Sequence, residues 1–107
     1  TLGYEWKEIH FTLPKGADWQ AAERMMRVTA SRIVDDYREE LLDSLQEMSN
    51  RFAFHPIQEE PHVFVKPQDD GTVRIWVRLA LPARGIAVGA DRLNRAFLEW
   101  QAGVTEV

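Results

Sequence analysis

Residues 72–81 read TVRIWVRLAL, a stretch in which an aliphatic side chain occupies every second position. Because successive side chains of a strand point to opposite faces of its sheet, this alternation predicts a strand with one buried face. We expect the aliphatic set to face the core and the intervening set to face away from it. The first set is Val73, Ile75, Val77, Leu79 and Leu81, and the second is Thr72, Arg74, Trp76, Arg78 and Ala80.

Two further strands are expected earlier in the chain. Residues 4–13, YEWKEIHFTL, alternate after the tryptophan and are followed by Pro14. Residues 62–66, HVFVK, alternate in the same way and are closed by Pro67. The sequence DDG at residues 69–71 supplies turn chemistry before the third strand, because its glycine can adopt a positive φ.

Two amphipathic helices are predicted between and after these strands. Residues 19–51 contain no glycine or proline, and apolar or small side chains recur in them every three or four positions. Asp18 is the expected N-cap. Unbroken, this helix would be about 50 Å long at ~1.5 Å per residue. A second helix is expected after Gly85, with Gly103 as its stop.

The order of these elements is strand, helix, strand, strand, helix. It predicts an α+β fold, a ferredoxin-like split βαβ sandwich in which the last strand is truncated and one helix is long. Right-handed crossovers would place both helices on the same face of the sheet. The length of 107 residues fits a single domain, 1–107.

The long helix is expected to overhang the sheet, because strands of about six residues span only ~20 Å. The apolar stripe of the overhang carries Tyr37, Leu41, Leu45 and Met48. We expect these residues to pack against another subunit, as candidate interface residues. The acidic residues of the same helix are expected on a solvated face or facing a basic partner; they are Asp35, Asp36, Glu39, Glu40, Asp43 and Glu47.

Composition excludes several classes of protein. The chain has no cysteine, so disulfides and thiolate metal sites are excluded. It has no apolar run of the ~18 residues that a membrane span needs. Its 4 Trp, 5 Phe and 2 Tyr, with 45% hydrophobic residues, can build a packed core, which excludes intrinsic disorder.

No catalytic, cofactor-binding or metal site is expected. The three histidines, His10, His55 and His62, do not have the spacing of metal ligands. No nucleophile elbow, phosphate-binding loop or dinucleotide fingerprint occurs. We therefore predict that the protein is not an enzyme and carries no cofactor.

The face of the sheet opposite the helices, the open face, carries the most informative surface. Aromatic and basic side chains interleave on it, as they do on sheets that bind single-stranded RNA. The Gly-flanked aromatic motif of those proteins is missing and the net charge is −4, so nucleic acid is an unlikely partner. Trp6, Phe64 and Trp76 are instead candidate subunit-interface residues. The open face is Trp6, Glu8, His10, His62, Phe64, Lys66, Arg74, Trp76 and Arg78.

Two sets of residues carry a resemblance to a known family through their order and spacing. The first lies at the starts of the first strand and first helix: Tyr4, Glu5, Trp6, Glu8, Ile9, Asp18, Trp19, Ala22 and Glu23. The second lies in the second and third strands: Pro61, Val63, Phe64, Val65, Val77, Arg78, Leu79 and Pro82. In these residues the chain resembles the C-terminal cytoplasmic α/β domain of small-conductance mechanosensitive channels, and the resemblance covers nearly the whole chain.

This resemblance implies a homoheptameric channel whose cytoplasmic domains form a vestibule with side openings. The chain would then be part of an integral membrane protein, on the cytoplasmic side of the inner membrane, and would contribute to the vestibule and to oligomer assembly. The gate residues of that family lie in a transmembrane helix, so none is carried over to this sequence. The alternative is a soluble ferredoxin-like regulatory module that binds a small ligand or single-stranded nucleic acid on its open face.

Overall fold

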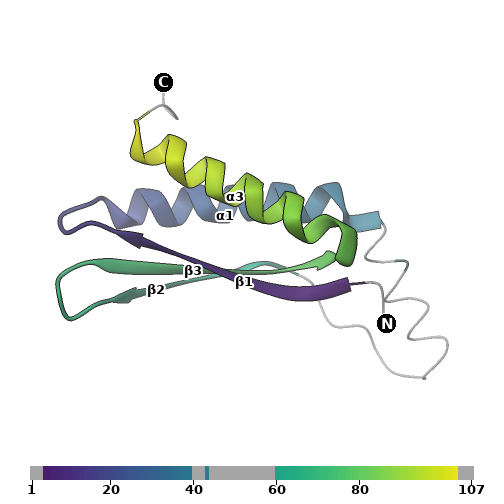
Figure 1. Cartoon of the computed structure of the whole chain (residues 1–107), viewed down its shortest axis with the longest axis horizontal. Coiled ribbons are helices and arrows are strands. Elements are labelled where there is room, and N and C mark those ends of the chain that lie inside the picture. Colours follow the sequence, from purple (N-terminus) through teal and green to yellow (C-terminus); the bar gives the residue numbers. More distant parts are fainter. Residues whose placement is uncertain (1–3, 40–42, 44–59, 104–107) are drawn as a thin grey trace.

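The computed structural model describes residues 4–39, 43 and 60–103, and it has the predicted α+β class. In chain order its elements are β1 (Tyr4–Leu13), α1 (Trp19–Asp36), β2 (His62–Pro67), β3 (Val73–Pro82), the 3₁₀ turn η1 (Ala83–Gly85) and α3 (Ile86–Gln101). The predicted order of strand, helix, strand, strand, helix is therefore confirmed. Both helices lie over the same face of the sheet (Figure 1).

The sheet has three antiparallel strands in the order β1-β3-β2. The strongly alternating strand β3 lies in the centre, where its aliphatic side chains pair with those of both neighbours. Ile75 lies between Phe11 of β1 and Val65 of β2, and Val77 lies between Ile9 and Val63. A slip of one residue would turn this whole set away from the helices, so the hydrophobic pattern fixes the register.

The core fills the space between the sheet and the two helices. Alternate residues of the strands meet the apolar stripe of each helix there, and none of the described residues buries a charged or polar side chain. The buried cluster is Phe11, Leu13, Ala22, Met26, Ala30, Ile33, Val34, Val63, Ile75, Val77, Leu79, Leu81, Leu93 and Phe97.

Helix α1 begins as the sequence predicts. The carboxylate of Asp18 accepts a hydrogen bond of 3.1 Å from the backbone N–H of Ala21 and so caps the first turn. Ala22, Met26, Ala30 and Ile33 follow at intervals of three and four residues and are fully buried. This spacing is what an apolar stripe on one face of a helix requires.

The prediction of an unbroken helix from residue 19 to residue 51 is wrong at Tyr37. Helix α1 ends at Asp36, and the N–H of Tyr37 donates to the carbonyl of Val34 at 3.0 Å, which tightens the last turn. Residues 38, 39 and 43 are again helical. No glycine or proline marks this end. The cause lies in tertiary packing, since the ring of Tyr37 packs against the core and against η1.

Helix α3 packs closely on β3 and α1. Gly89 is buried, and a Cβ added there would lie 2.5 Å from Cδ1 of Leu81 and 3.4 Å from Cγ2 of Ile33. The helix ends as predicted before Gly103, which has a φ of +75°. The turn between β2 and β3 likewise uses Gly71 at a φ of +89°.

Candidate functional site

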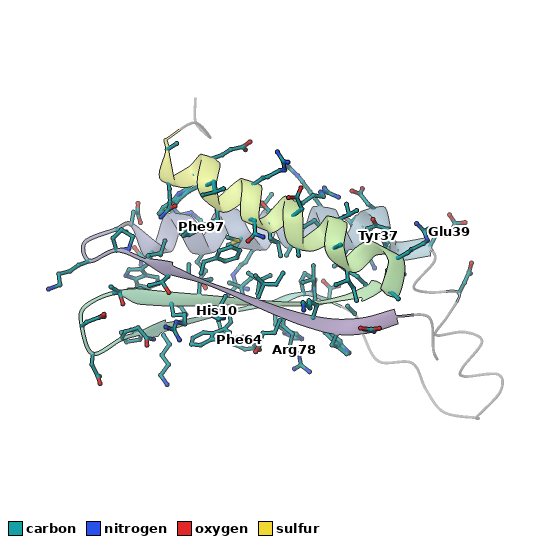
Figure 2. All side chains as sticks on the ribbon, in the orientation of Figure 1. His10, Tyr37, Glu39, Phe64, Arg78 and Phe97 are labelled. Carbon is teal, nitrogen blue, oxygen red and sulfur yellow. The ribbon has the colours of Figure 1, made fainter. Side chains whose placement is uncertain are left out.

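The structure brings Trp6, Phe64 and Trp76 together on the open face, as the sequence predicts. All three lie at strand positions whose side chains point away from the helices. Figure 2 shows His10, Phe64 and Arg78 on the far side of the sheet from Phe97, which points into the core. The open face of the described residues is therefore built by one side of three adjacent strands.

The centre of the open face is an aromatic row that crosses all three strands. Trp76 of β3 lies directly between His10 of β1 and Phe64 of β2. The ring centroids of His10 and Trp76 are 6.2 Å apart. The side chain of Phe64 is 50% exposed, although it is a large apolar residue. Cross-strand aromatic neighbours of this kind stabilise a sheet, but they leave their outer surface in water.

A second aromatic group extends the row toward one end of the sheet. The rings of Trp6 and His62 are stacked with centroids 6.1 Å apart, and those of His62 and Phe64 are 6.0 Å apart. Trp6 lies opposite Ala80, a small side chain that is fully buried. The small residue leaves room for the indole to lie over the sheet, toward β2.

The arginines of β3 lie over the tryptophan rings. The guanidinium carbon of Arg78 is 5.0 Å from the centroid of the Trp6 ring, and that of Arg74 is 5.7 Å from the centroid of Trp76. Such cation–π contacts contribute ~0.5–1 kcal/mol at exposed sites. The Nε of Arg74 is buried and has no hydrogen-bond acceptor in the described part of the chain. Stacking thus orients the guanidinium groups without using their N–H donors.

Tyr37 does not lie with the other candidate interface residues. Its half-buried ring packs against the core of the same chain, with the Arg84 guanidinium 5.8 Å from the ring centroid. Tyr37 is thus supported by its own chain and anchors the end of α1, and its place in a subunit interface stays a prediction. The other three residues of that expected interface, Leu41, Leu45 and Met48, lie outside the described residues.

Among the described residues, two titratable groups have clearly shifted pKa values, and both are exposed. The hydroxyl and the backbone N–H of Thr72 donate to the carboxylate of Asp70, at 2.6 and 3.0 Å, and hold the pKa of Asp70 below its ordinary value near 3.8. The hydrogen bond to Asp91 raises the pKa of Arg95. Neither shift arises in a cleft, so neither points to acid–base chemistry.

Within residues 4–39, 43 and 60–103, no group of three histidine or carboxylate side chains is placed to hold a metal ion. His10 and His62 lie on the open face, where rings are their neighbours, and His55 lies outside the described residues. The absence of an enzyme activity, a cofactor and a metal stays a prediction.

The sequence reasoning missed two hollows. A cavity of about 250 Å³ between the start of α1 and the β2–β3 hairpin is lined by Trp19, Val65, Pro67 and Val73. The ring of Trp19 is 39% exposed there. A wider groove of about 600 Å³ between α1 and α3 contains Val28, which is 49% exposed. Each hollow forms where a helix packs against another element. The periodicity of a single element does not show how two elements pack, so the sequence could not predict either hollow.

Comparison with known proteins gives no relative: no family model, no curated protein and no solved structure matches the chain. Among the helices of the described residues, none has both the length and the apolar character to cross a membrane. The open face is thus the feature of this structure from which a function can be argued.

Proposed function

We propose that this chain is the cytoplasmic α+β domain of a mechanosensitive channel subunit, and that it works by self-association. The proposal combines the resemblance in the sequence with the order of the elements. The proposal includes the assignment of the fold as ferredoxin-like. That assignment is supported by the order β1-β3-β2 with antiparallel pairing, and by β1, which has no neighbour on its outer edge among the described residues.

The observation that carries the proposal is the aromatic surface of the open face. Neither α1 nor α3 covers it, because both helices lie on the other side of the sheet (Figure 1). Phe64, which is half exposed, would bury about 100 Å² of apolar surface on contact, worth ~2.5 kcal/mol at ~25 cal/mol per Å² before the costs of association. Together with Trp6 and Trp76, this ring forms the kind of anchor on which interfaces depend.

Self-association is tested by sedimentation equilibrium over a wide range of protein concentration. The wild-type chain should associate reversibly, and Trp76→Ala and Phe64→Ser should each weaken the association while the circular dichroism spectrum is unchanged. Leu98→Ala is the matched control, because Leu98 is 62% exposed but lies on α3, away from the open face. An unchanged association constant in both variants of the open face would contradict the proposal.

The channel part of the proposal is tested on the complete gene product. Apolar segments of ~20 residues encoded before Thr1 would support a channel subunit, and a soluble enzyme domain encoded there would contradict it. Where the segments are present, patch-clamp recording under membrane tension should show channels, and Trp76→Ala should reduce the number of assembled channels. The resemblance implies seven subunits, which native mass spectrometry of the purified protein can count.

The arginines over the tryptophans favour a second candidate, a regulatory module that binds single-stranded nucleic acid or a small ligand. Bases stack on exposed rings, and guanidinium groups bind phosphates. Titration of the intrinsic tryptophan fluorescence with a single-stranded oligonucleotide, at 50 and 200 mM salt, tests this candidate. Tight binding that falls steeply with salt would favour nucleic acid over self-association.

A further inference from the structure

Some cations of the protein have a carboxylate partner and others have none. Among the helical residues, Arg24 and Arg32 form no ion pair with a described residue, and four arginines form one; the four are Arg27, Arg38, Arg92 and Arg95. On the open face, Lys66, Arg74 and Arg78 form none within the part of the chain that the structure describes. The strand cations thus have charge that no carboxylate of the described chain neutralises.

The geometry of the sheet determines which side chains surround the strand cations. On a helix, a carboxylate three or four positions away shares the surface with an arginine. On the sheet, the nearest side chains come from neighbouring strands. Arg74 lies between Thr12 and Lys66, and Arg78 lies between Glu8 and His62. Glu8 and Arg78 are directly opposite each other but form no ion pair, and Arg78 lies instead over the ring of Trp6.

The charge of the open face opposes a contact of this face with its own copy. Its three cations and the single carboxylate of Glu8 leave a net charge of +2, with histidines neutral. Two copies of the face pressed together would place like charges close to one another in a desolvated interface, which costs several kcal/mol. The chain carries −4 in total, so the rest of it carries −6. A negative surface is therefore available on every other copy.

The exposed end of α1 and the residues after it provide such a surface. Asp35 and Asp36 are paired with Arg38 and Arg92, respectively. Glu39 and Asp43, which follow, are exposed and form no ion pair with other described residues. Figure 2 shows Glu39 at the end of the helical layer, on the opposite side of the sheet plane from Phe64 and Arg78. The two charged surfaces therefore point in different directions.

We propose that the open face of one copy binds the two acidic residues that follow α1 in a second copy, Glu39 and Asp43, here called the acidic end. The carboxylates of Glu39 and Asp43 would face the guanidinium groups of Arg74 and Arg78. The accessible N–H groups of these arginines would donate charge-assisted hydrogen bonds to the carboxylates of the next copy, whereas the buried Nε of Arg74 is out of reach. This inference rests on the proposed self-association and specifies its geometry.

The contact is heterologous, because each copy contributes a different surface to it. A heterologous contact repeats from copy to copy and yields a ring where the rotation closes. It follows that two copies with different disabled surfaces can still form one contact with each other. If the open faces of two copies bound each other instead, a copy with a disabled open face could form no contact at all.

The test uses two variants of the chain that remove charge. Arg74→Gln with Arg78→Gln disables the open face, and Glu39→Gln with Asp43→Asn disables the acidic end. Each alone should associate about tenfold or more weakly than wild type in sedimentation velocity. Mixed in equal amounts, they should still associate as a 1:1 dimer that grows no further. Asp69→Asn with Glu99→Gln, two exposed positions elsewhere, changes the net charge as the acidic-end variant does and should associate like wild type.

Each contrary outcome identifies what has failed. If the acidic-end variant associates like wild type while Phe64→Ser does not, the heterologous contact is wrong and self-association through the open face stands. If Phe64→Ser also associates like wild type, the proposed function is wrong as well. Association of either variant alone into species as large as those of wild type would overturn the pairing of these two surfaces. Circular dichroism of every variant establishes that it is folded.

Discussion

The contact between Tyr37 and Gly85 can be tested by adding a single methyl group. A Cβ at Gly85 would lie 2.8 Å from Cζ of the Tyr37 ring and 3.0 and 3.2 Å from its two Cε atoms. Gly85 has φ −97° and ψ −5°, a conformation that alanine also adopts. The substitution Gly85→Ala therefore isolates the steric conflict with the ring from any strain of the backbone.

Two opposing effects decide the result. Replacing glycine by alanine at a compatible conformation stabilises a protein by ~0.4–1 kcal/mol, because the unfolded chain loses freedom. Forcing an extra carbon into packed surroundings costs ~1–3 kcal/mol. The ring is rigid and Gly85 is buried, so the steric cost should prevail. We expect Gly85→Ala to lower the free energy of unfolding by about 1 kcal/mol.

The same substitution in a Tyr37→Ala background should have the opposite sign. Without the ring, the added methyl group meets no obstacle, and the free energy of unfolding should rise by ~0.4–1 kcal/mol. Urea unfolding of the four proteins, followed by circular dichroism, measures this cycle. Tyr37→Phe keeps the ring and should respond to Gly85→Ala as wild type does. Equal stabilisation in the presence and absence of the ring would refute the placement of Tyr37 against η1.

Two further predictions concern the core and the β2–β3 turn. Leu93→Ala should lower the free energy of unfolding by ~2–5 kcal/mol in urea, because Leu93 is fully buried, whereas Leu98→Ala on the exposed side of α3 should change it by less than ~0.5 kcal/mol. The hydrogen bonds from Thr72 lower the pKa of Asp70, so their contribution to stability is full above the ordinary pKa near 3.8 and is lost as the pH falls through the lowered value. Asp70→Asn should remove this acid-side dependence from unfolding curves measured between pH 2 and 5, and an unchanged pH profile would show that another group causes it.

Much of the fold could be predicted because its signals are local. The alternation in β3 determines which side chains face the helices, and Asp18 marks the first turn of α1. The end of α1 could not be predicted in this way. Nothing in the sequence after Asp36 breaks a helix, and the chain departs from it because Tyr37 packs on a turn almost fifty residues away. Such long-range packing overrides local propensity and leaves no periodic signal.

The sequence could predict which residues form the candidate site, but not which contacts they make with one another. Alternation alone assigned Trp6, Phe64 and Trp76 to one face, since strand geometry requires it. It could not show that Arg78 would lie over Trp6 rather than pair with Glu8, because that choice depends on register and on competing contacts. The pairing of carboxylates with arginines on α1 and α3 is likewise a property of how the two helices meet.

The alternation in β3 places one set of side chains in the core and the other set on the open face, and the two sets are subject to different constraints. Every second residue of β3 is fixed by packing against the helices, so the remaining positions are free to carry charge and rings. In a face that only meets water, each cation–π contact contributes only ~0.5–1 kcal/mol. Stacking there excludes water from one side of each guanidinium, and in Arg74 it leaves a buried donor without an acceptor, which costs ~1–3 kcal/mol. A second molecule that brings carboxylates to the accessible N–H groups of these arginines would add charge-assisted hydrogen bonds to the stacking, and for this reason we expect the face to be bound.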